Sequence, residues 1–405
     1  MAKPSWRFIK SSSFAIKELA PVEIFIRHTF AYPSPTTISY FWGFGSIAGI
    51  FLVIQIITGI LLAMHYCPNV EFAYSSIQYI LQDVNKGWLI RYAHANGSSF
   101  FFIATYLHMG RGLFFRSYAK PRQRLWFSGV ALFLCMMITA FLGYILPWGQ
   151  MSLWGATVIT NLLSTLPKIG EYLVTWLWGG FSVNNSTLNR FFSLHYLMPF
   201  VMVGLSLAHL SFLHTAGSSN PTGIDSRLEV IRFYPYFFWK DLVCSFAFCI
   251  LFFWCVYQAP EALGHTDNWI KANPLVTPVH IVPEWYFLPF YGILKAVPSK
   301  TWGVILMFAS ILTLIPLPYL DASSKIPTLF GRPYTTLCFY LFIVIVVILT
   351  LSGVLPVTEF YLNNSKLAAL YYFSFFFLLI PSFSRLENMF WYESCLKIIR
   401  ESIRR

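Results

Sequence analysis

Residues 87–112 read GWLIRYAHANGSSFFFIATYLHMGRG, an apolar stretch that carries His94 and His108 fourteen positions apart. A second stretch at residues 190–213, RFFSLHYLMPFVMVGLSLAHLSFL, carries His195 and His209 with the same spacing. Each stretch exceeds the roughly 20 residues that an α-helix needs to cross about 30 Å of hydrocarbon. Fourteen helical residues rise about 21 Å and stop about 40° short of four turns, so each histidine pair projects from nearly one helix face at two depths.

Composition places the whole chain in a membrane rather than in solution. Hydrophobic residues make up 57% of the 405 residues, charged residues make up 11%, and the mean hydropathy is +0.61. Soluble chains average about 25% charged residues. Seven cysteines in 405 residues are too sparse, and odd in number, for a disulfide scaffold. They include no Cys-x-x-Cys pair, which excludes a zinc knuckle and c-type haem attachment.

Apolar runs long enough to span a bilayer occur eight times, and none shows the alternating ten-residue pattern of a membrane β-barrel. We therefore expect an all-α integral membrane protein with eight transmembrane helices, of which the first four form a bundle. The expected spans lie near residues 38–66, 89–115, 126–147, 190–213, 241–258, 301–320, 335–356 and 365–381.

The basic residues indicate how these spans are oriented. Eight spans place both termini on one side of the membrane, and the loops of that side hold 20 of the 28 Lys and Arg residues. The positive-inside rule makes this the negative (N) side and the opposite face the positive (P) side. The net charge of +12 is therefore an orientation signal, and nucleic acid is not expected as a partner.

The chain divides into six predicted segments. Prolines and glycine break the connection near residues 148–189, which predicts short helices along the membrane surface, and six prolines between 259 and 300 exclude a spanning helix there. The opening residues lack the apolar core of a secretory signal, so no cleaved segment is expected. The first three segments are an N-side N-terminal segment (1–37), a four-helix bundle with P-side interfacial helices (38–213), and an N-side loop with the fifth span (214–258). The other three are a P-side loop (259–300), the last three spans (301–381) and an N-side tail (382–405). We expect the tail to form a short amphipathic helix at the headgroups.

The four histidines predict two bis-imidazole sites stacked across the bilayer. Both helices run from the P side to the N side, so His94 lies level with His195 and His108 with His209. One such histidine alone is explained as well by a satisfied core residue, but ionisable groups in hydrocarbon are costly and mark pathways or cofactors. Only two ligands converge at each level, whereas zinc takes three or four. Two b-type haems with no open coordination position fit better and predict electron transfer.

Glycines and arginines accompany these histidines. Four glycines in the first and third spans repeat the 14-residue spacing: Gly45 and Gly59, Gly129 and Gly143. Glycine lets a backbone approach a flat macrocycle, although it is also frequent in membrane spans for helix packing. Arg91 precedes His94 by three residues and Arg111 follows His108 by three, so each shares its histidine's face. Both are expected to pair with haem propionates, the alternative being arginines that snorkel at helix ends.

These residues, together with the PEWY segment at 283–286, closely resemble mitochondrial-type cytochrome b, the core subunit of the respiratory cytochrome bc complex (ubiquinol:cytochrome c oxidoreductase, complex III). The resemblance runs from about residue 35 to 381. Its stretches include QIITGILLAMHY at 55–66, GYILPWGQMSLWGATVITNLL at 143–163 and SSNPTGI at 218–224. Eight fused spans and equal histidine spacing favour the respiratory form over the photosynthetic relative.

The resemblance implies that His94 and His195 ligate a low-potential haem near the P side, and that His108 and His209 ligate a high-potential haem near the N side. Ubiquinol would be oxidised at the P side, with one electron passing to a Rieske iron-sulfur protein. The other would pass through both haems to reduce quinone at the N side, with protons translocated. Glu284 is the expected proton acceptor.

The resemblance also implies the remaining site residues, partners and location. The quinol pocket would include Glu284, Tyr291, Tyr286, Trp154 and Gly155, and the N-side quinone site would include His214, Ser218 and Asp241. Expected partners are the Rieske protein, a cytochrome c-type subunit, other complex subunits, a second copy of the chain and membrane lipid. The expected location is the mitochondrial inner membrane, with both termini in the matrix.

The chain departs from the family pattern in two respects, and its sequence leaves two alternative functions open. The family usually carries Asn where this chain has Gly43, so an amide contact to quinone is absent there, and residues 1–30 and 382–405 match poorly. A stand-alone di-haem cytochrome is a second hypothesis, opposed by Glu284 and the four extra spans. A secondary transporter is a third, opposed by the absence of two repeated halves with broken helices.

Overall fold

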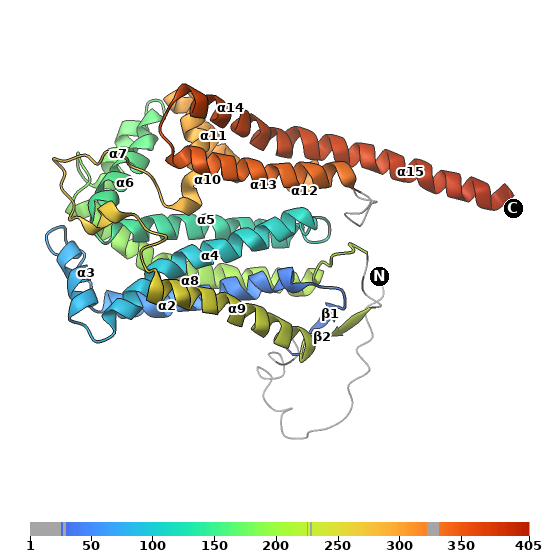
Figure 1. Cartoon of the computed structure of the whole chain (residues 1–405), viewed down its shortest axis with the longest axis horizontal. Helices are drawn as coiled ribbons and strands as arrows, with labels where there is room; N and C mark the ends of the chain where they lie inside the picture. The colour runs from blue at the N-terminus through green and yellow to red at the C-terminus, as the bar shows by residue number, and fades with distance from the viewer. Residues whose placement is uncertain (1–25, 27–29, 225, 227–228, 322–331, 405) are drawn as a thin grey trace, which may run out of the picture.

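The computed structural model describes residues 26, 30–224, 226, 229–321 and 332–404, and most of these are helical. The predicted N-terminal segment therefore lies largely outside the described residues. Figure 1 shows the long helices running side by side, an arrangement that keeps backbone hydrogen bonds within each apolar helix. Six described helices are long and apolar enough to cross a membrane: Tyr40–Ala63, Gln123–Ile145, Asn185–Ala216, Tyr236–Gln258, Pro333–Val354 and Glu359–Ser394. These helices are those of a multi-pass membrane protein.

The predicted count of eight spans is not confirmed. Helix α4 (Gly87–Phe114) occupies the second predicted span and has 28 residues, but its polar side chains lower its hydropathy. The predicted span 301–320 is divided into α11 (Lys300–Leu312) and the four-residue α12 (Leu317–Leu320). Pro316 and Pro318 explain this break, because each lacks a backbone N–H and clashes with the preceding helical turn.

The first spans pack as two helix pairs. Helix α2 (Phe44–Ala63), which follows the short helix η1 (Tyr40–Gly43), packs along α4, and α5 (Gln123–Ile145) packs along α8 (Asn185–Ala216). Helix α9 (Tyr236–Gln258) packs on the α2 and α4 pair through a buried aromatic cluster. The two pairs leave between them the space into which the histidines of α4 and α8 project.

The two long connections gather at one end of the long helices, and the two strands lie at the other end (Figure 1). The first connection forms short helices, as predicted, and the second has no helix longer than nine residues among those described. The elements of the first end are α3 (Ala73–Gln82), α6 (Gln150–Asn161), η2 (Leu162–Thr165), α7 (Gly170–Trp178), η3 (Thr266–Trp269), η4 (Trp285–Phe287) and α10 (Leu288–Ala296). Strand β1 (Pro33–Pro35) pairs antiparallel with β2 (Val230–Arg232).

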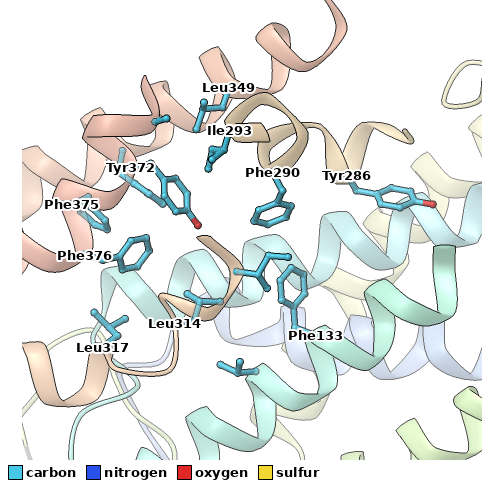
Figure 2. Close-up of a cluster of buried hydrophobic side chains, with 14 of the residues drawn as sticks. Phe133, Tyr286, Phe290, Ile293, Leu314, Leu317, Leu349, Tyr372, Phe375 and Phe376 are labelled. Carbon is cyan, nitrogen blue, oxygen red and sulfur yellow. The ribbon is translucent and has the colours of Figure 1, made fainter. Parts of the chain in front are cut away.

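The C-terminal helices pack around α10. Helices α13 (Pro333–Val354) and α14 (Glu359–Ser374) both contact it. Figure 2 shows Phe290 and Ile293 from α10 in one buried cluster with Leu349 from α13 and Tyr372 from α14. Because α10 directly follows η4, this cluster fixes the position of the PEWY segment.

The predicted boundary at residue 382 does not exist as a break. Helix α14 continues through a π-helical turn (Phe375–Leu379) into α15 (Ile380–Arg404), which extends past the other helices in Figure 1. The π turn ends two residues before Pro381, whose ring would clash with the carbonyl four residues earlier in a regular α-helix. The wider turn explains how the helix continues across the predicted boundary.

Candidate functional site

The structure brings the four intramembrane histidines together in two facing pairs. The ring centroids of His94 and His195 lie 6.2 Å apart, and those of His108 and His209 lie 6.4 Å apart. In each pair one ring comes from α4 and the other from α8. The level pairing expected from the fourteen-residue spacing is the pairing that the helices make.

These separations fit two imidazoles on opposite sides of one metal ion. A histidine nitrogen lies about 2.0 to 2.1 Å from a bound metal ion, and the ring centre lies about 1.1 Å further, which places opposed ring centres about 6.2 to 6.4 Å apart. Within the described ranges, no group of three or more His, Cys, Asp and Glu side chains is placed to hold a metal. Each pair therefore offers two facing imidazole ligands to one metal ion.

The Nδ1 atom of each histidine is occupied by a group outside the pair. His94 Nδ1 lies 2.9 Å from Thr58 Oγ1, His195 Nδ1 2.8 Å from the Thr139 carbonyl, His209 Nδ1 2.8 Å from Ser128 Oγ and His108 Nδ1 3.1 Å from Arg111 Nη2. At His94, His195 and His209 the neighbouring oxygen can accept a hydrogen bond from Nδ1, which leaves Nε2 available as a ligand, whereas the Arg111 guanidinium can only donate to His108 Nδ1. Metal-binding histidines commonly have such a partner on the other nitrogen, because it holds the ring in place.

The four glycines each lie against one of these rings. A Cβ added to them would approach the Cε1 atom of a facing histidine: Gly45 to 3.0 Å of His108, Gly59 to 3.1 Å of His94, Gly129 to 3.1 Å of His209 and Gly143 to 2.4 Å of His195. The closest of these contacts is shorter than real Cβ atoms make. In the described structure the glycines therefore admit the imidazole rings themselves.

A large cavity surrounds the first pair. It has an empty volume of about 1400 Å³, including space open to the exterior, and its lining includes His94, His195, Gly143 and Arg91. Because both rings of the pair line it, the cavity suits a planar group held between them.

The arginine beside the second pair is poised for an anion. The guanidinium of Arg111 lies 4.9 Å from the centre of the Trp42 ring, and its buried Nε atom has no hydrogen-bond partner among the described residues. Buried donors are nearly always satisfied, and a carboxylate is the strongest partner for a guanidinium. Arg111 thus fits the predicted contact with acidic substituents of a macrocycle.

A second cavity of about 440 Å³ adjoins the first. Three residues predicted for the quinol pocket line it, namely Gly155, Glu284 and Tyr291. Tyr144, which was not predicted, lines it as well. Glu284 and Tyr144 line both cavities. Burial raises the pKa of Glu284 to about 7, while a hydrogen bond from Tyr144 and the charge of Arg91 oppose that rise.

Two predicted pocket residues lie elsewhere. Tyr286 lines the first cavity instead, and its ring stacks on Phe102 with centroids 3.9 Å apart and planes 3° apart. Trp154 packs against a buried cluster beside α6 and does not line the second cavity. Sequence reasoning missed Tyr144, although it directly follows Gly143 in a stretch already singled out.

The predicted N-side residues fall in two places. Tyr32 lies beside His214 and Ser218: its ring lies 4.6 Å from the His214 ring, and its hydroxyl donates to the Leu213 carbonyl at 3.3 Å. Asp241 instead accepts a hydrogen bond from Ser46 Oγ at 2.6 Å. A Cβ added at Gly43 would lie 3.2 Å from Asp241 Oδ1, so the departure from the family residue leaves room beside this carboxylate.

Comparisons with known proteins agree with this geometry. The family model for cytochrome b/b6/petB matches residues 29–217, and that for the C-terminal part of cytochrome b/b6/petD matches residues 271–373. Cytochrome b of Rickettsia bellii is 54% identical over 91% of this chain and 92% of its own length, and that of Phytophthora megasperma is 51% identical over 94% and 97%. A solved chain of a hyperthermophilic respiratory complex III superposes with a TM-score of 0.87 at 33% identity, covering 92% of this chain and 98% of its own. The chain therefore belongs to the cytochrome b family, which binds b-type haem.

Proposed function

We propose that this chain is the di-haem, quinol-oxidising subunit of a mitochondrial cytochrome bc complex, a ubiquinol:cytochrome c oxidoreductase. The observation that carries the proposal is the pair of facing histidine sites at two levels between α4 and α8. Each histidine pair would hold a b-type haem, which would supply one-electron transfer. Two such groups at different depths suit electron movement across a membrane.

The chain's own residues would hold the two haems in distinct surroundings. His94 and His195 would hold the low-potential haem near the P side, within the large cavity. His108 and His209 would hold the high-potential haem near the N side, and Arg111 lies next to them. Arg91 and Arg111 would pair with the propionates, because each is a donor beside its histidine pair.

Glu284 would accept a proton from ubiquinol in the second cavity. A carboxyl whose pKa is about 7 is half ionised near neutral pH, which suits a general base at that pH. Because Glu284 lines both cavities, its carboxyl can take a proton on one side and release it on the other. Gly155 and Tyr291 would form walls of the quinol pocket, with Trp154 and Tyr286 packed behind them.

The remaining steps require partners and a second quinone site. Of the two electrons that a quinol releases, one would leave to a Rieske iron-sulfur protein and then to a cytochrome c-type subunit. The other would cross to the N side, where His214, Ser218 and Asp241 would supply protons to quinone. We infer a homodimer embedded in lipid with other subunits, and both termini of the chain in the matrix.

The test of the quinol-oxidising role is Glu284→Gln in the purified complex. Loss of a general base lowers rates by about 10² to 10⁴, so ubiquinol:cytochrome c reductase kcat should fall at least tenfold while the b-haem spectrum is unchanged. The matched control is Glu171→Gln, an exposed carboxylate on α7 in the same end of the molecule. A Glu284→Gln complex with full activity would contradict the role, and would favour a di-haem cytochrome without this quinol site.

A further inference from the structure

We propose that Thr58 and Ser128 are positioning residues that fix the tautomer of one histidine in each pair. The inference rests on the proposed haem-binding role of the pairs and extends it to two side chains outside the ligand set. One residue lies on α2 and the other on α5, so each acts from the helix packed beside its histidine's helix.

The hydroxyl proton of Thr58 is already committed within its own helix. Thr58 Oγ1 donates to the Ile54 carbonyl at 2.6 Å, while it lies 2.9 Å from His94 Nδ1. A hydroxyl has one proton to donate and two lone pairs that accept. Thr58 must therefore accept from His94, so the Nδ1 atom carries the proton and Nε2 keeps its lone pair.

Ser128 makes the same arrangement at the other level. Its Oγ donates to the Leu125 carbonyl at 2.8 Å and lies 2.8 Å from His209 Nδ1. The serine oxygen is then the acceptor for the Nδ1 proton of His209. The proton positions are inferred from the distances between heavy atoms and from the number of protons that each group can donate.

A glycine follows each of these residues and contacts the same ring. A Cβ at Gly59 would lie 3.1 Å from His94 Cε1, and a Cβ at Gly129 would lie 3.1 Å from His209 Cε1. Each hydroxyl and glycine pair thus provides an acceptor for the ring nitrogen and space for the adjacent ring carbon. The facing histidine, His195, uses the Thr139 backbone carbonyl instead, which no side-chain change removes.

The predicted consequence is electronic as well as geometric. An imidazole that donates from Nδ1 becomes a more basic ligand at Nε2, and outer partners of this kind alter affinity or activity by about 10- to 100-fold. A more basic axial ligand favours the oxidised metal. Removing the acceptor should therefore raise the midpoint potential of the affected haem alone.

The experiment is a redox titration of both haems in complexes that carry Thr58→Val or Ser128→Ala. Thr58→Val should shift only the P-side haem, and Ser128→Ala only the N-side haem. We expect each reduction equilibrium to change about tenfold, which is about 59 mV for a one-electron couple. Thr58→Ser and Ser128→Thr keep the acceptor and should restore the original potentials. The low-spin electron paramagnetic resonance signal of the affected haem should shift with its potential.

Two controls make the same helix back-bond without touching a histidine. Thr350 donates to Val346 O at 2.8 Å and Ser310 to Met307 O at 2.6 Å, so Thr350→Val and Ser310→Ala should leave both potentials unchanged. If Thr58→Val does not assemble, Thr58→Ala removes the same acceptor and carries the same prediction. Both haems retained at unchanged potentials would overturn the positioning role, whereas a wild-type complex without two haems would overturn the proposed function itself.

Discussion

At the scale of single residues, the pKa of Glu284 makes the pH dependence of quinol oxidation a direct test. The carboxyl can accept a proton only when ionised, and burial has raised its pKa to about 7. The rate should therefore rise with pH through about 7 and fall below it as the acceptor becomes protonated. The check is a kcat profile between pH 5.5 and 8.5, in which Glu284→Gln should remove this limb. A wild-type profile that is flat across pH 7 would contradict the assignment.

Gly143 offers a second test at this scale. A Cβ there would lie 2.4 Å from His195 Cε1, so Gly143→Ala forces the ring away from its position. We expect the pyridine haemochrome content to fall from two haems to about one per chain, with the P-side haem lost. Gly204→Ala on α8 is the matched control, since a Cβ there meets nothing within 4 Å. Full haem content at unchanged potentials in Gly143→Ala would show that the ring does not need this space.

At the scale of elements, α10 sits so close to α13 that only glycine fits between them. A Cβ at Gly292 would lie 2.3 Å from the Leu349 carbonyl, and Lys295 Nζ donates to the Gly353 and Leu355 carbonyls at 3.2 and 2.7 Å. Gly292→Ala should push α10, and with it Tyr291, away from the second cavity. Overpacking of this kind costs about 1 to 3 kcal/mol.

The expected result for Gly292→Ala is a lower thermal midpoint and a several-fold lower quinol-oxidation kcat, with both haem spectra unchanged. Gly110→Ala, where a Cβ meets nothing within 4 Å, controls for the change of residue type. Unaltered stability and turnover would mean that α13 does not position the pocket.

Among the elements, the sequence predicts the long helices better than the short ones. The pairing of His94 with His195 follows from helix periodicity and from the predicted shared direction of the two long helices. Which cavity Tyr286 and Trp154 would face could not be predicted, because side chains in short helices point where tertiary packing directs them. Hydrophobicity predicts a single span at 301–320, but Pro316 and Pro318 divide it into two helices.

At the scale of the whole molecule, buried charges tie the extended C-terminal helix to the rest of the chain. Arg332 lies 3.4 Å from both Asp321 and Glu387, and Glu387 also accepts from Thr335 Oγ1 at 2.7 Å. Removing one partner of a buried ion pair costs about 3 to 5 kcal/mol.

Glu387→Ala should therefore lower the thermal midpoint and expose α15 to limited proteolysis. Glu393→Ala, an exposed carboxylate further along the same helix, should change neither. Equal behaviour of the two variants would show that the network does not anchor the helix.

The two stacked histidine pairs are the centre of this interpretation, and one measurement tests them most directly. It is a redox-titrated absorbance spectrum of the purified complex, with pyridine haemochrome quantitation per chain. We predict two b haems per chain with separate midpoint potentials. One haem, or none, would contradict the assignment of His94, His195, His108 and His209 as ligands.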